Sequence, residues 1–171
     1  MRYLVIGTYV GLATVGIFMY WYMYYSWAGD GHTLVSFNQL RNWSECNDWS
    51  PKFQVANFGI YDFTSNPCDY FVWGKQKACT LSLTTLVVIE MFNAMNALGE
   101  DASLFKIGII SNPFLLLAIF GSVVLHFVIL YIPFFANIFG TVPLTVNDWI
   151  LVIIASFPVC IIEEVLKWIS R

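Results

Sequence analysis

Long apolar runs separated by polar segments form the main pattern of this chain. The runs cover residues 3–26, 78–98, 113–135 and 149–169. At about 1.5 Å of rise per helical residue, each run can cross a hydrocarbon layer of about 30 Å. The pattern predicts an all-α membrane protein with four transmembrane helices, organised as one domain over residues 1–171.

Polar connections join the four runs and divide the chain between two sides of the membrane. Residues 27–77 are rich in Asn, Ser, Asp, Gly and Trp. This segment is too long for a simple turn, and we expect it to fold as a compact cap. Four crossings place both termini and residues 99–112 on one side, with residues 27–77 and 136–148 on the other.

Two features of the long loop indicate which side is which. Lysine and arginine residues are divided evenly between the sides, so the positive-inside rule decides little. Cys46 and Cys68 have a sequence separation at which a disulfide could form in an oxidising compartment. Asn42 begins the glycosylation sequon Asn-Trp-Ser. We therefore expect a lumenal loop and cytosolic termini, with the use of the sequon left open.

Composition restricts the class of protein. The chain is 58% hydrophobic and only 11% charged, which excludes a soluble domain of this size. A net charge of −3 without a basic block gives no indication of nucleic-acid binding. The four cysteines form no CxxC pair, so a zinc site is unsupported. The motifs GxxxxGK[ST], HExxH and GxSxG do not occur, and no catalytic residue is predicted.

The second apolar run contains one carboxylate, Glu90, in the stretch VVIEMFNAMNAL. A charge at mid-membrane costs about 2.5–3.5 kcal/mol, so such a residue normally turns toward a cation, a proton path or a partner. Asn93 and Asn96 continue a polar strip along the same helix and are candidate supporting groups. Carboxylate and amide oxygens favour Ca²⁺ over a soft transition metal. The alternative is a buried structural carboxylate bonded to a neighbouring helix.

This strip is too small for a complete calcium site, because Ca²⁺ takes about 6–8 oxygen ligands. No other run carries a central acid, so we expect the remaining ligands on another chain or on further sequence. Gly7, Gly11 and Gly16 form a small-residue pattern that lets another helix approach the first run closely. That helix could belong to these four or lie outside them.

Other polar residues in the runs have simpler interpretations. Glu163 and Glu164 lie near the end of the last run, where we expect them to reach the cytosolic interface. Lys167 follows Glu163 by one helical turn and can pair with it. His126 in the third run is expected to be neutral and to form a hydrogen bond with a neighbouring helix.

Four stretches together resemble the C-terminal part of P-type calcium pumps, most closely the sarco/endoplasmic-reticulum type. The block VVIEMFNAMNALGEDASL carries the most specific part of the match. The matching stretches are residues 2–16, 87–104, 125–149 and 156–171. The resemblance covers nearly the whole chain and is weakest in the long loop.

The resemblance implies a role for each part of the chain. The four helices would be the seventh to tenth of a ten-helix pump in the endoplasmic or sarcoplasmic reticulum membrane. Glu90 would give a side-chain oxygen to one of two Ca²⁺ sites, with the other ligands on the fourth, fifth and sixth helices. Cys46 and Cys68 would form the lumenal disulfide of the family, and the glycines of the first helix would contact the fifth.

The chain also departs from the family pattern. It reads KIGIIS at residues 106–111, where relatives usually have an MPPW-like stretch, and the usual Asp-Glu of the last helix is Glu163-Glu164. The motifs DKTG and TGE do not occur. We therefore expect a segment of a larger translocase that does not pump by itself. Its partners would be lipid, the remaining helices and cytosolic domains that bind ATP and Mg²⁺. The alternatives are a stand-alone four-span protein that assembles with or regulates a pump, and part of a P-type ATPase for another cation.

Overall fold

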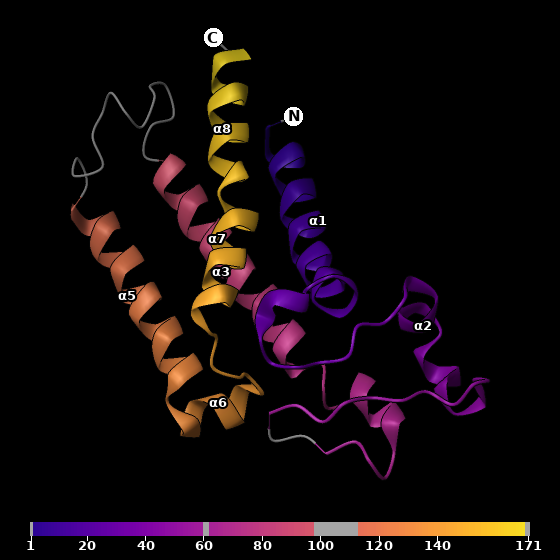
Figure 1. Cartoon of the computed structure of the whole chain (residues 1–171). Coiled ribbons are helices and arrows are strands. Elements are labelled where there is room, and N and C mark those ends of the chain that lie inside the picture. Colours follow the sequence, from indigo (N-terminus) through magenta and orange to yellow (C-terminus); the bar gives the residue numbers. More distant parts are fainter. Residues whose placement is uncertain (1, 60–61, 98–112, 170–171) are drawn as a thin grey trace.

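A computed structural model describes residues 2–59, 62–97 and 113–169 (Figure 1). Within these residues, four helical segments are long and apolar enough to cross a membrane, which confirms the predicted fold class. The longer helices are α1 (Arg2–Met23), α3 (Gln76–Ala97), α5 (Pro113–Tyr131), α6 (Pro133–Phe139), α7 (Val146–Ser156) and α8 (Pro158–Ile169). The long loop adds α2 (Phe37–Arg41) and the short helices η1 (Ser26–Ala28), η2 (Trp43–Asp48) and η3 (Pro67–Phe71). The predicted connection 99–112 lies outside the described residues.

Two prolines divide the apolar runs differently from the sequence prediction. The third run was expected to continue to residue 135, but α5 ends at Tyr131 and Pro133 begins α6. Proline has no backbone N–H and is favoured at the start of a helix, where that donor would have no partner. Pro158 likewise begins α8 directly after α7, and the two helices together form one span.

The last span also begins earlier than predicted. Thr145 caps α7 through a reciprocal pair of hydrogen bonds with Asp148. The Asp148 backbone N–H donates to the Thr145 hydroxyl, and the Thr145 N–H donates to the Asp148 carboxylate. This capping box satisfies two donors that would otherwise lack partners, so the helix begins at Val146 and not at residue 149.

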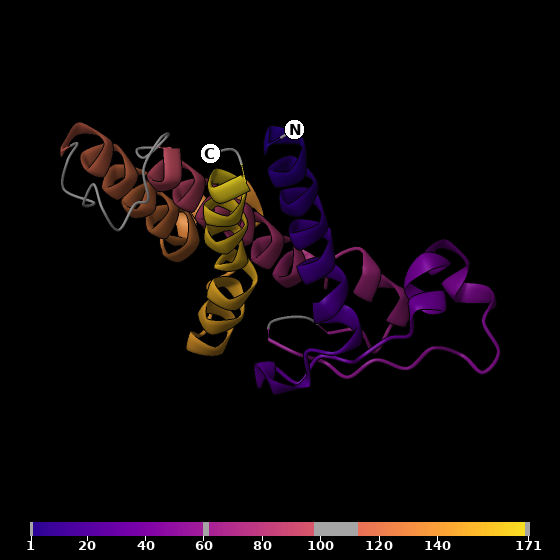
Figure 2. The same ribbon diagram turned by 90° about the horizontal axis from the view of Figure 1, so that it is seen from above.

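Helix α3 is the centre of the membrane-spanning bundle. It packs against α1, α5, α7 and α8. The views in Figures 1 and 2 both place the two ends of the chain at the same end of the bundle. The long loop lies at the opposite end of α1. For the two termini and the long loop, this arrangement is the one expected from four crossings.

An aromatic core holds the long loop against the end of α1. Trp21, Tyr22 and Tyr25 of α1 and its extension are almost completely buried, together with Tyr70 of η3. The Tyr70 ring meets that of Tyr22 edge to face at a centroid distance of 5.5 Å, a favourable geometry for aromatic pairs. Gly74 allows the chain to pass this core, because a Cβ atom there would lie 2.5 Å from the Tyr70 carbonyl oxygen.

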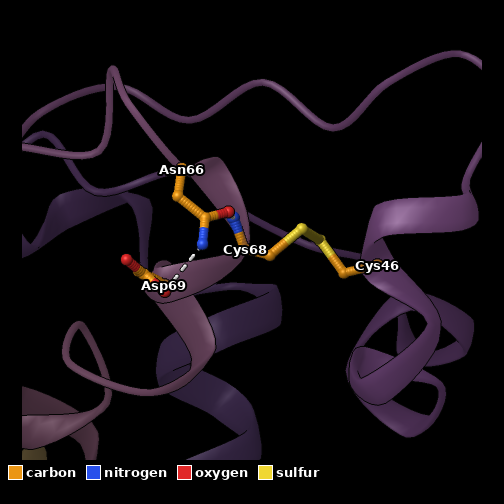
Figure 3. The surroundings of a disulfide bond; sticks show 4 residues. All are labelled: Cys46, Asn66, Cys68 and Asp69. Atoms are coloured by element: carbon orange, nitrogen blue, oxygen red, sulfur yellow. Dashed lines mark hydrogen bonds between the residues drawn. A yellow bond between two sulfur atoms is a disulfide. The ribbon is translucent and has the colours of Figure 1, made fainter.

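A disulfide joins the two halves of the loop. It links Cys46 of η2 to Cys68 of η3, with 5.8 Å between their Cα atoms (Figure 3). Asn66 accepts a hydrogen bond from the backbone N–H of Cys68, and its side-chain amide donates to Asp69 at 3.0 Å. The loop is therefore the compact cap that its length and composition predict.

Candidate metal-ligand site

Glu90 is exposed on the outer face of α3. The preceding residue, Ile89, is completely buried in a small cluster with Ile6 of α1 and Val159 of α8. Successive residues of a helix point about 100° apart, so burying Ile89 turns Glu90 away from this cluster. The carboxylate does not enter the bundle formed by the described helices, although a charged residue in an apolar span normally turns inward.

The two asparagines of the predicted polar strip lie in different surroundings. Asn93 is half-buried, and its Oδ1 atom has no hydrogen-bond partner among the described residues. Asn96 is almost completely buried, and its backbone carbonyl accepts a hydrogen bond of 2.9 Å from the Lys167 ammonium of α8. From Glu90 through Asn93 to Asn96, the side chains therefore pass from an exposed position to one buried beside α8.

Within the described residues, no group of three or more acidic, histidine or cysteine side chains is placed to hold a metal ion. Glu90 is therefore a single carboxylate on a helix surface. Since Ca²⁺ requires about 6–8 oxygens, this surface can supply one part of a calcium site.

The glycines of α1 also face outward. A Cβ atom added at Gly7, Gly11 or Gly16 would meet nothing within 4 Å apart from the adjoining backbone of its own helix. Small residues matter for helix packing where two backbones come close, and the described helices make no such approach here. Of the two interpretations of this pattern, packing among these four helices receives no support, and the surface is open to a further helix.

A family model described as "Cation transporting ATPase, C-terminus" matches residues 1–169. This chain belongs to that family. It is 54% identical over its full length to calcium-transporting ATPase 2, endoplasmic reticulum-type, of Arabidopsis thaliana. It is 51% identical over its full length to a calcium-transporting ATPase of Plasmodium falciparum (isolate K1 / Thailand), and 39% identical to a probable calcium-transporting ATPase of Trypanosoma brucei brucei. The chain spans only 17%, 14% and 16% of these relatives.

The last helix of this ATPase segment differs from the predicted cytosolic anchor. Glu163 is 4% exposed and Lys167 is 3% exposed, so both lie within the helix packing and not at an open interface. The Lys167 ammonium donates to the carbonyl of Asn96 and lies 3.6 Å from Oε1 of Glu164. The hydrogen bond to Asn96 fastens the end of α8 to the end of α3, one to two helical turns beyond Glu90, and the contact with Glu164 lies within α8.

Sequence reasoning missed a buried ionic cluster at the loop side of the ATPase segment. Asp148 at the start of α7 is completely buried and forms an ion pair with Lys77 of α3. The Tyr25 hydroxyl donates to the other Asp148 oxygen at 2.9 Å. Burial and this hydrogen bond raise the pKa of Tyr25 well above its ordinary value, so the phenol keeps its proton and remains a donor. The cluster ties together the ends of three membrane-spanning segments.

The expected histidine contact is present in the ATPase segment. His126 of α5 is buried, and its Nε2 lies 3.1 Å from the Thr84 hydroxyl of α3. This bond and the ring contact between Phe127 and Trp149 hold α5 beside α3 and α7. We assign these residues to the packing of the bundle.

Proposed function

We propose that this chain is the C-terminal membrane segment of an ATP-driven calcium pump of the endoplasmic reticulum. Glu90 gives one carboxylate oxygen to a Ca²⁺ transport site, and helices outside this chain provide the remaining ligands. The relatives reported above carry the name calcium-transporting ATPase, and the one from Arabidopsis thaliana is of the endoplasmic reticulum type. These names favour calcium over another cation.

The outward direction of Glu90 is the observation that carries this proposal. A carboxylate facing lipid from an apolar span costs at least about 2.5–3.5 kcal/mol. That cost is avoided when the open face of α3 is covered by protein that brings a cation or a proton to the carboxylate. The unoccupied glycine surface of α1 supports the same conclusion, because it also accepts a close neighbour.

The chemistry of this position follows from the charge of the side chain. An ionised Glu90 binds Ca²⁺ as a hard oxygen ligand, and the carboxylate takes up a proton once the ion has left. Either state avoids an uncompensated negative charge within the membrane. ATP and Mg²⁺ bind to domains outside this chain, and the energy of phosphorylation reaches Glu90 through movement of the helices around it.

The proposed orientation places the long loop in the lumen. The loop contains the Cys46–Cys68 disulfide, and such bonds persist in oxidising compartments. Both ends of the chain lie at the opposite end of the bundle and would face the cytosol. The N-terminal residues of α1 and the last turn of α8 would then lie on the side of the ATP-binding domains.

The substitution Glu90→Gln in the intact protein tests the function. It keeps the shape of the side chain and removes its negative charge. We expect the Ca²⁺ concentration for half-maximal phosphorylation from ATP to rise by at least about tenfold, because calcium affinity follows ligand charge. Glu45→Gln, in the exposed part of the long loop, is the matched control and should leave this concentration unchanged. Unchanged calcium dependence in the Glu90 variant would remove this residue from the site.

A reading of the coding DNA upstream of Met1 separates a pump segment from a stand-alone four-span protein. An in-frame DKTG motif with further acidic transmembrane helices would support the pump. An isolated promoter and start codon would support the stand-alone protein and overturn the proposal.

A further inference from the structure

A groove of about 570 Å³ lies where the long loop meets the membrane-spanning helices. One wall is the loop-side half of α1, and the other is formed by α2 and the segment that leads into α3. Figures 1 and 2 both show α2 standing beside this end of α1. The residues that define the groove include Phe18, Tyr22, Phe37, Leu40, Arg41 and Lys75.

The groove crosses the boundary between hydrocarbon and water. Val15 and Phe18 belong to a membrane-spanning segment, so that wall lies at the depth of the acyl chains. Phe37 and Trp43 on the opposite wall belong to the loop, yet they are 52% and 50% exposed. Aromatic side chains are enriched at the level of lipid headgroups, where the ring contacts acyl chains and its edge contacts polar groups. The position of the groove suits a molecule that is apolar at one end and polar at the other.

The charge at the groove is positive. Arg41 and Lys75 are both exposed, and both line it. No acidic residue is among the described residues that line it. Long basic side chains lay their methylene groups along apolar surface and hold the charge at the headgroup level. Two such charges above an apolar trough match an anionic headgroup attached to an acyl chain.

We propose that this groove binds one anionic phospholipid from the leaflet on the side of the long loop. Its phosphate lies between Arg41 and Lys75, and one acyl chain lies against Val15, Phe18 and Phe37. The volume falls within the range of about 300–1,000 Å³ that is usual for small-molecule sites. The lipid covers aromatic surface that the chain itself leaves exposed, and it connects α2 to α1.

The test uses the intact protein in nanodiscs that contain phosphatidylserine with a photoactivatable group in one acyl chain. After illumination, labelled peptides are mapped by mass spectrometry. The charge variant is Arg41→Gln/Lys75→Gln, and the matched control is Lys52→Gln, which changes an exposed loop lysine outside this groove. A second variant, Val15→Trp, fills the groove and keeps both charges.

We expect labelling of the peptides that contain Phe37 and Trp43. Each basic residue near an anionic headgroup strengthens binding roughly fivefold, so the charge variant should bind about 30-fold more weakly. Val15→Trp should also reduce labelling, and Lys52→Gln should leave it unchanged. Millimolar inorganic phosphate should not compete, because it cannot fill the apolar trough.

Three results would overturn the proposal. Equal labelling in the charge variant would show that the basic residues do not select the lipid. An unlabelled groove in the unchanged protein would show that another part of the protein covers it. Full competition by inorganic phosphate would identify a site for a free anion.

Discussion

The two ends of the helical bundle differ in how completely they are closed. At the loop end, Trp21 and Tyr70 are fully buried in an aromatic core, a disulfide joins the loop, and Asp148 is enclosed with its partners. Toward the other end, Glu90 and the glycines Gly7 and Gly11 of α1 face outward. Among the described residues, the apolar cluster there has only three buried members, Ile6, Ile89 and Val159.

This difference indicates that the two ends of the bundle have different roles. The residues of the loop end contact one another, so this end of the bundle can stay rigid. On the surface that carries Glu90, the described helices leave polar and small residues uncovered. Such a surface is suited to contact with helices outside this chain. A buried residue such as Asp148 and an exposed residue such as Glu90 therefore serve different purposes, although both are single carboxylates in apolar surroundings.

The largest effect on the closed end should come from Asp148→Ala. This change leaves the Lys77 ammonium buried without its counter-ion and the Tyr25 hydroxyl without its acceptor. Removing one partner of a buried ion pair costs about 3–5 kcal/mol. We expect a large fall in the temperature at which the detergent-solubilised intact protein loses its monodisperse peak. Asp48→Ala, at an exposed loop position, should have little effect.

The double variant Lys77→Met/Asp148→Leu sharpens this experiment. It removes both charges and fills their space with apolar atoms, so it should recover much of the stability lost in the single variant. A double variant as unstable as Asp148→Ala would show that the ion pair itself is not the source of the loss.

The next effect should come from Cys46→Ser/Cys68→Ser. The two cysteines are 22 residues apart, and a crosslink over a loop of that length stabilises by about 3 kcal/mol in the chain-entropy account. We expect faster protease cleavage of the long loop in membranes opened on the loop side. Cys79→Ser changes a cysteine outside the disulfide and should leave the cleavage rate unchanged. Equal rates in both variants would contradict a stabilising role for the bond.

A smaller effect is expected on the open surface from Gly7→Leu/Gly11→Leu. The described helices have space for both side chains, so the segment itself should tolerate them. In the intact protein they should disturb the close neighbour, at a cost of about 1–3 kcal/mol for overpacking. Gly121→Leu on α5 is the matched control, since its Cβ would also meet open space. A thermal stability equal to that of the control would show that no helix covers this part of α1.

The smallest effect should appear on acidification of the loop. Asp62 accepts hydrogen bonds from the backbone and hydroxyl of Thr64 and from the Asn57 amide. The Thr64 and Asn57 bonds lower the pKa of Asp62 from 3.8. Since the folded pKa is depressed, the stabilisation is complete above pH 3.8 and is lost as pH falls through the lower folded value.

The rate of protease cleavage of the loop, measured from about pH 5 to about pH 2, checks this linkage. Asp62→Asn should be cleaved slightly faster at the upper end of the range and should lose part of the acid dependence. An acid dependence identical to that of the unchanged protein would contradict the role of Asp62.

The sequence was sufficient for the features that depend on local pattern. Apolar length predicts the four spans, and the single carboxylate of VVIEMFNAMNAL identifies Glu90 as a residue that needs a partner. The proline positions explain the division at Pro133 and Pro158, although apolar length alone placed the end of the third helix too late. These features follow from neighbouring residues of the chain.

The remaining features depend on contacts between segments far apart in the sequence. Lys77 and Asp148 each stand at the edge of a polar connection, where a charge normally faces water, so nothing local indicates that they meet. Glu163 was expected near the interface, but the packing of α8 on α3 buries it. The direction of Glu90 likewise depends on which side of α3 its neighbours cover.

Equilibrium binding of radioactive calcium to the intact purified protein tests the central claim most directly. The Glu90→Gln variant should bind one of its calcium ions more weakly by on the order of 100-fold, because the site loses a charged ligand. Glu45→Gln should bind as the unchanged protein does. Unaltered affinity and stoichiometry in the Glu90→Gln protein would contradict the assignment of this carboxylate to a calcium site.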